Sequence, residues 1–168
     1  MISKLLTAPH EGDRLSHDEC LNLIMNVLAG GVDTTQAQLA QAIRLFAGEP
    51  SQWELLASRP ELVPAAVEEV LRFEPITPFT ANRDPGSYSE PLRFDILAER
   101  GKTKPMTFGA GIHNCLGANL ARAELQEALG FLALRMGELD LAGEVEFGSV
   151  AGVYGVERLP IRFRARTV

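Results

Sequence analysis

The chain has 168 residues, of which 22 are acidic and 16 basic, and its formal net charge is −6. This acidic balance argues against nucleic acid or an anionic membrane as a partner. No apolar run reaches the ~18 residues of a membrane helix, no signal peptide is visible, and two distant cysteines supply no disulfide framework. We therefore expect a cytoplasmic protein with one domain over residues 1–168, since this length buries roughly 70% of its unfolded surface.

The first predicted element is a long helix that ends near Gly48. Ser16 and Glu19 have the spacing of a capping box, and the apolar residues over 21–46 recur at helical period. A helix of roughly 28 residues would be about 40 Å long. The segment GGVDTT (30–35) interrupts the period, and each glycine weakens the helix by about 1 kcal/mol relative to alanine. Taken alone, it favours a packing groove for a crossing helix over a binding groove.

A short helix over 51–58 is expected next, followed by a helix that prolines 60 and 64 introduce and prolines 75 and 78 close. This second helix carries EEVLRFEP, in which Glu69 and Arg72 lie one turn apart and can form an ion pair. Without further context, such a pair is typical of a surface helix. Residues 79–107 contain proline, glycine and asparagine at intervals that predict a loop.

Cys115 is the residue that most needs an explanation. Gly109, Gly111 and Gly117 surround it in a loop, and a helix is predicted from Leu116 to about residue 135. The unpaired amides and the dipole of that helix stabilise a thiolate at its N-terminus. The C-terminal remainder alternates enough over VEFGSVAGVYGVERLPIRFRA to predict two or three short strands.

A thiolate is either a nucleophile or a metal ligand. The nucleophile needs a base, for which His113 is the neighbour, but no further orienting residue is apparent. Zinc needs three or four ligands, and Cys20 is the only other cysteine. A lone thiolate suits a cofactor that brings its own remaining ligands, such as heme. A buried, inert cysteine remains the alternative on composition alone.

The string FGAGIHNCLG resembles the cysteine-ligand loop FxxGx(R/H)xCxG of the cytochrome P-450 family. The matching positions are Phe108, Gly111, His113, Cys115 and Gly117. The resemblance implies heme b (iron-protoporphyrin) with the Cys115 thiolate as its axial ligand. It also implies that His113 reaches a heme propionate and that Phe108 shields the sulfur.

Two further motifs of this family stand in the right order. GGVDTT resembles the groove of the family's distal helix, so that Gly30 and Gly31 would face the heme while Asp33 and Thr34 carry protons during oxygen activation. EEVLRFEP resembles the ExxR helix, whose Glu and Arg form a buried structural pair beneath the heme. The implied fold is a truncated cytochrome P-450 fold, mainly α with a few short C-terminal strands.

The chain also departs from the family pattern. Its resemblance covers only the C-terminal part of the family, and a strand pair with a propionate-binding arginine is missing after Pro78. Ala98 stands where bacterial members often have an arginine that joins the Glu–Arg pair. Arg100 can replace that arginine only if the loop is shifted.

The resemblance implies a monooxygenase that takes electrons from a ferredoxin- or flavin-type donor and acts on a small organic substrate. The alternatives are a non-catalytic, truncated heme-binding protein and a decayed fragment. The long helix is apolar on more than one face, which predicts self-association or pairing with a second chain. The apolar residues concerned are Leu21, Leu23, Ile24, Val27, Leu28, Leu39, Ile43 and Leu45.

Overall fold

The structure is a computed structural model that describes residues 15–77, 80–101, 103–150 and 153–167. Residue contacts divide the chain into two compact units, one ending at Thr34 and the other beginning at Thr35. The first described element, α2 (His17–Gly48), has residues in both units. That the whole chain forms one domain stays a prediction. Within the described ranges, no helix has the length and apolar character needed to cross a membrane.

Helix α2 begins at the predicted capping box and is longer than expected. The backbone N–H of Ser16 donates to Glu19 Oε2 at 2.8 Å, and the N–H of Glu19 donates to Ser16 Oγ at 3.3 Å. These reciprocal bonds satisfy donors that would otherwise be unpaired at the helix start. The helix has 32 residues and continues through GGVDTT without a break.

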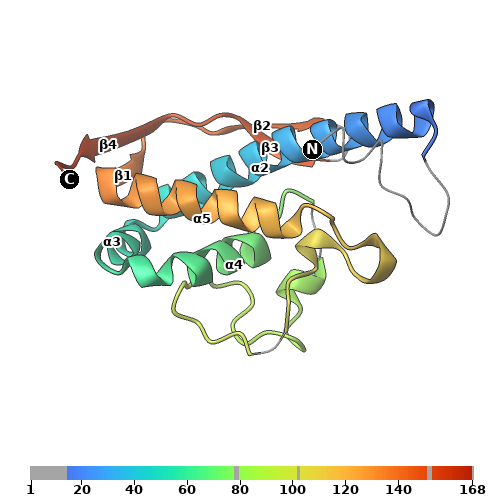
Figure 1. Ribbon diagram of the computed structural model, residues 1–168. Helices are drawn as coiled ribbons and strands as arrows, with labels where there is room; N and C mark the ends of the chain where they lie inside the picture. The colour runs from blue at the N-terminus through green and yellow to red at the C-terminus, as the bar shows by residue number, and fades with distance from the viewer. Residues whose placement is uncertain (1–14, 78–79, 102, 151–152, 168) are drawn as a thin grey trace. The chain divides into compact units, whose positions relative to one another are not determined.

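Three further helices form the scaffold of the second unit (Figure 1). They are α3 (Pro50–Ser58), α4 (Val63–Phe73) and α5 (Ala118–Arg135), and α5 packs against both of the others. Pro64 lies in the first turn of α4, as predicted, whereas α3 begins at Pro50, one residue before its predicted start. Proline is tolerated at both places because it lacks only an N–H that has no partner there. Helix α5 begins two residues later than predicted, since Gly117 is its N-cap.

The core of this unit contains residues from all its helices. Phe46, near the end of α2, places its ring 5.2 Å from that of Trp53 and 5.3 Å from that of Phe94. Trp53 is fully buried, and its indole N–H donates to the carbonyl oxygen of Met136 at 2.6 Å. Other core residues are Leu56, Val67, Leu71, Ile96, Leu125, Leu129 and Leu139.

The described residues contain four strands rather than the two or three predicted. Strand β1 (Met136–Leu141) pairs antiparallel with β4 (Ile161–Ala165), and β2 (Glu146–Val150) pairs antiparallel with β3 (Val153–Arg158). Strand β1, which follows α5 without a loop, was not predicted. The predicted fold class, mainly α with a few short C-terminal strands, is confirmed.

The segment between α4 and α5 is irregular, as predicted, apart from short 3₁₀ turns at Thr80–Arg83, Met106–Phe108 and Gly111–His113. Two side chains fix its beginning to the helices. The Gln38 amide donates to Glu74 O at 2.9 Å and accepts from the N–H of Ile76 at 3.2 Å. Arg83 donates from Nε to the carbonyl oxygen of Phe73 at 2.9 Å. The junction after Pro78, where a missing segment was predicted, includes residues 78 and 79, which lie outside the described residues.

Candidate functional site

The Cys115 loop is closed by backbone hydrogen bonds. The N–H of Cys115 donates to the carbonyl oxygen of Phe108 at 2.8 Å, and the carbonyl oxygen of Cys115 accepts from the N–H of Ala118 at 3.3 Å. The first bond joins the two sides of the loop, and the second joins Cys115 to the first turn of α5. Cys115 thus lies three residues before Ala118, the first residue of α5, and is joined to the first turn of that helix by this hydrogen bond.

Two glycines of this loop, Gly109 and Gly111, have a positive φ, and Gly109 has a second reason to lack a side chain. Gly109 has a φ of +72°, and a Cβ there would lie 3.1 Å from the carbonyl oxygen of His113. A side chain at this position would therefore be strained and would also press on the backbone. Gly117 is different, because a Cβ there would meet the Cys115 sulfur at an ordinary 3.9 Å.

The loop presents its sulfur and its apolar side chains to the outside. Cys115 and His113 are exposed, and Cys115 is a free thiol. Ile112 is 97% exposed and Leu116 is 90% exposed. Apolar side chains this exposed on both sides of a thiol indicate an interaction or ligand-binding surface. The alternative that Cys115 is buried is therefore wrong.

The residues around Cys115 do not form a conventional metal site. Across the part of the chain that the structure describes, no group of three or more His, Cys, Asp and Glu side chains could hold a metal ion.

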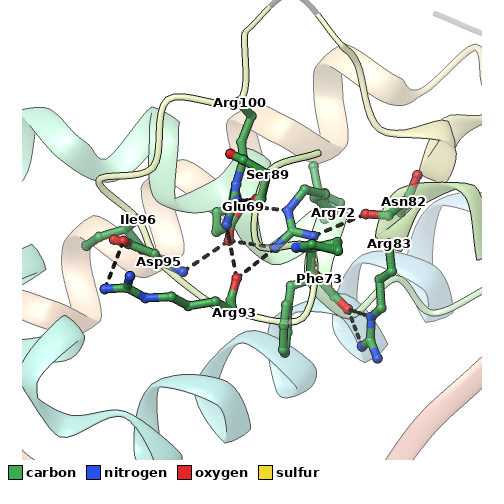
Figure 2. A network of polar contacts seen from close by, with 12 residues as sticks. Glu69, Arg72, Phe73, Asn82, Arg83, Ser89, Arg93, Asp95, Ile96 and Arg100 are labelled. Atoms are coloured by element: carbon green, nitrogen blue, oxygen red, sulfur yellow. Dashed lines mark hydrogen bonds and ion pairs between the residues drawn. The ribbon is translucent and has the colours of Figure 1, made fainter. Parts of the chain in front are cut away.

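Glu69 and Arg72 form a buried ion pair on α4 (Figure 2). Their exposed fractions are 4% and 1%, and the Arg72 guanidinium donates two hydrogen bonds of 2.8 Å to the two Glu69 carboxylate oxygens. Arg72 also donates to the carbonyl oxygens of Asn82, Pro91 and Arg93 at 2.9–3.1 Å. The pair therefore holds the irregular segment against α4 and is no ordinary surface contact.

Arg100 completes this pair from the loop, which the sequence analysis made conditional on a shift. Its Nη2 donates to Glu69 Oε1 at 2.6 Å and its Nε donates to Oε2 at 3.2 Å (Figure 2). It also donates to the carbonyl oxygen of Ser89 at 2.6 Å. Arg100 thus reaches the carboxylate from a position two residues after Ala98, and Glu69 is bound by two arginines.

The pKa of Glu69 shows the balance of forces at this buried carboxylate. Burial raises the pKa of Glu69. Hydrogen bonds from Arg72, Arg100 and the backbone of Asp95, together with the charge of Arg72, lower the pKa by more than burial raises it. The net result is a pKa below the ordinary value of 4.5. Glu69 is therefore held in its charged form at neutral pH.

A second ion pair connects α4 to α5 beside the Cys115 loop. Arg122 on α5 donates from Nε and Nη2 to the two carboxylate oxygens of Glu68 at 2.5 and 3.3 Å. The Arg122 guanidinium also lies over the ring of Phe108, with its carbon 4.6 Å from the ring centre. A cavity of about 1280 Å³ is lined by these three residues together with Cys115 and Arg72.

Asp33 and Thr34 lie in the unit that ends at Thr34, whereas Cys115, Glu69 and Arg72 lie in the other. The Thr34 hydroxyl donates to the carbonyl oxygen of Gly30 at 2.5 Å, within α2. Gly30 and Gly31 have no side chains, so this turn of α2 exposes its backbone. The roles of these four residues stay predictions.

Comparison with known proteins identifies what the chain is similar to. Residues 76–135 match the family model described as Cytochrome P-450. Luteothin monooxygenase from Streptomyces thioluteus is 37% identical over 98% of this chain and 47% of its own length. Nocardicin C N-oxygenase from Nocardia uniformis is 36% identical over 84% of this chain and 42% of its own length.

Solved structures give the same result. A cytochrome P-450 from Chondromyces apiculatus matches with a TM-score of 0.89 and 29% identity over 99% of this chain and 50% of the other. The chain thus spans about half the length of the relatives it matches. The alignment with luteothin monooxygenase runs over 193 positions, more than the 168 residues of this chain, so the relative has residues inside the matched region that this chain lacks.

Proposed function

The chain belongs to the cytochrome P-450 family, and we propose that it contributes the heme-ligating part of a heme-thiolate monooxygenase. The observation that carries this proposal is the Cys115 loop, in which a free, exposed thiol precedes a helix and stands between exposed apolar residues. Cys115 is proposed as the axial ligand of heme b. Phe108, Gly111, His113 and Gly117 are proposed as its cofactor-binding neighbours.

The residues of the loop fit the group that the family implies. A single thiolate is the only donor that a heme needs from this side, because the porphyrin supplies four nitrogen ligands itself. Ile112 and Leu116, which are almost fully exposed, are suited to contact with an apolar macrocycle. His113 is exposed in the same loop and is available to donate to a propionate.

Heme held by a cysteine thiolate supplies the electron-rich iron that favours cleavage of the O–O bond. The protein's own proposed contribution is the supply of protons from α2. The hydroxyl group of Thr34 and the carboxyl group of Asp33 are proposed to hold and transfer protons on this helix. In the structure the Thr34 hydroxyl proton is donated to the carbonyl oxygen of Gly30, so its oxygen is the atom that can accept a further hydrogen bond.

We propose a small organic substrate and a separate ferredoxin- or flavin-type electron donor, as in the family. The names of the relatives describe oxygenation of organic molecules, namely a luteothin monooxygenase and a nocardicin C N-oxygenase. The chain spans about half the length of these relatives, and oxygenation of a substrate is the activity to which we propose that it contributes. The alternative function is a heme-binding protein without turnover.

Heme titration of the purified chain tests the proposal. We expect one heme to bind per chain, with binding weakened in Cys115→Ser and unchanged in the matched control Cys20→Ser, whose thiol is buried in the other unit. Equal affinity for heme in both variants would show that Cys115 is not a heme ligand. Turnover with peroxide or with an electron donor then separates a monooxygenase from a non-catalytic heme protein.

A further inference from the structure

Arg122 contacts α4, Phe108 and the first turn of α5, which are the parts of the second unit that border the Cys115 loop. Its guanidinium forms a two-pronged ion pair with Glu68 of α4, and the same planar group lies over the ring of Phe108 at 4.6 Å. Its Nη1 also contacts the carbonyl oxygen of Ala118, one turn earlier in α5, at 3.4 Å. Because Glu68 and the carbonyl oxygen of Ala118 both bind the guanidinium, it has little freedom to move away from the Phe108 ring.

Phe108 is in turn joined directly to the ligand residue. Its carbonyl oxygen accepts the N–H of Cys115 at 2.8 Å, so any movement of Phe108 moves the bond that closes the loop. Phe108 is only partly buried and packs at the margin of the core. The core alone therefore does not hold it, and the stacked guanidinium supplies a contact on the face of the ring.

We infer that Arg122, held by Glu68, is a positioning residue that clamps Phe108 and thereby fixes the backbone of the Cys115 loop. The contact between a cation and an aromatic face is worth most when other bonds hold the cation in place. The inference deepens the proposed function, because it rests on Cys115 as the heme ligand. It concerns residues that the chain itself contains, whether or not heme is bound.

Hydrogen exchange of the Cys115 amide tests the clamp in the heme-free chain. We expect Arg122→Gln to increase the exchange rate of this amide about two- to fivefold, the range that corresponds to a partly exposed cation–aromatic contact. Glu68→Gln should act in the same direction, because it frees the guanidinium. Amides in the middle of α5, such as that of Leu129, should keep their wild-type rates, which separates a local effect from general destabilisation.

The chain offers a matched control on the same helix. Arg135 lies over the ring of Phe131, 3.7 Å from its centre, and donates to the carbonyl oxygen of Phe131. Arg135→Gln removes the same kind of contact at the opposite end of α5, away from the Cys115 loop. It should leave the exchange of the Cys115 amide unchanged.

A double-variant cycle tests whether Arg122 acts through Phe108. In a Phe108→Leu background, Arg122→Gln should cause little further acceleration, because the ring that it clamps is absent. Equal acceleration in both backgrounds would overturn the inference and assign Arg122 a direct electrostatic effect. If Arg122→Gln yields too little folded protein, Arg122→Lys replaces it, since lysine keeps the charge but loses the planar fork.

The heme-loaded chain gives a second, spectroscopic test. Arg122→Gln should increase the share of the ferrous carbon monoxide complex that lacks the red-shifted thiolate band, whereas Arg135→Gln should not. If the wild-type chain binds no heme, the proposed function fails and the exchange cycle still decides the clamp. If heme binds but the exchange rates of the variants equal the wild type, the clamp fails and the proposed function stands.

Discussion

Arg72 has the largest number of interactions of the site residues and makes a clear test at the scale of one side chain. It is almost completely buried and forms five hydrogen bonds, two to Glu69 and three to carbonyl oxygens of the irregular segment. Arg72→Ala leaves the buried carboxylate of Glu69 with fewer partners, at a cost of about 3–5 kcal/mol in the free energy of unfolding. Urea denaturation followed by circular dichroism measures this.

The control for this prediction is Arg93→Ala. The Arg93 side chain is 59% exposed and pairs with Glu90 and Asp95 at the surface, so its loss should change stability by about 0.5 kcal/mol or less. If Arg72→Ala has the same denaturation midpoint as Arg93→Ala, the buried pair does not stabilise the fold.

Arg100 is predicted to be required at its own position in the loop. Arg100→Ala removes two hydrogen bonds to Glu69 and should lower the free energy of unfolding by about 1–3 kcal/mol at neutral pH. Adding Ala98→Arg to this variant should not restore stability, because the backbone brings residue 100 to the carboxylate. Full rescue would show that the loop accepts an arginine at either position.

The same variant has a predictable pH dependence. Arg100 lowers the pKa of Glu69, so its contribution is present above the ordinary value of 4.5 and is lost as the pH falls through the lower, folded value. The difference in unfolding free energy between the wild type and Arg100→Ala should therefore shrink in acid. A difference that stays constant down to the acid unfolding transition would argue against the assignment.

At the scale of elements, Gln38 connects α2 to the chain that follows α4. Both ends of its amide are bonded to backbone groups, at Glu74 and Ile76, and the side chain is buried. Gln38→Leu leaves these backbone groups without partners and should cost about 1–3 kcal/mol in stability. The matched control is Gln36→Leu, at an exposed position of the same helix. Equal thermal midpoints for the two variants would contradict this role.

The sequence predicts some elements of this fold better than others. The capping box at Ser16 and the helix-starting prolines have local physical causes, so they are visible in the sequence and the structure confirms them. Strand β1 was missed because its residues, MGELDL, follow α5 directly and alternate over only two apolar positions, Leu139 and Leu141. Strand β1 pairs with β4, which is distant in sequence, and a local hydrophobic pattern cannot indicate such a pairing.

The site shows the same division. The spacing of Glu69 and Arg72 predicts that they meet, because α4 sets their geometry. The contact of Arg100 with Glu69 depends on an irregular loop, so spacing alone left it conditional. The stacking of Arg122 on Phe108 depends on how α5 packs against α4, and no motif in the sequence indicates it.

Two of the apolar α2 residues from which self-association was predicted, Ile43 and Leu45, are buried in the core of the second unit. At the scale of the whole molecule, the prediction therefore applies to the N-terminal part of α2. Leu21, Met25, Leu28 and Val32 have the i, i+4, i+7, i+11 spacing of one helix face, and all four are exposed. An apolar stripe of this kind marks an interaction site or an aggregation liability. Light scattering should therefore give a molar mass above that of one chain, and the mass should rise with concentration.

Charges placed on this stripe should reverse the association. Met25→Glu combined with Leu28→Glu is expected to return the chain to a monomer, whereas Asn26→Glu, on an exposed position beside the stripe, should not. A wild-type chain that stays monomeric at high concentration would refute the prediction, and so would association that the paired glutamates leave unchanged.

The central claim is that Cys115 is a heme-thiolate ligand, and the spectrum of the reduced, carbon monoxide-bound chain tests it most directly. A thiolate opposite carbon monoxide gives the red-shifted band typical of the family. We predict this band for the heme-loaded wild type and for Cys20→Ser, and its loss in Cys115→Ser. A band that persists in Cys115→Ser, or a wild-type chain that binds heme without ever showing it, would contradict the account.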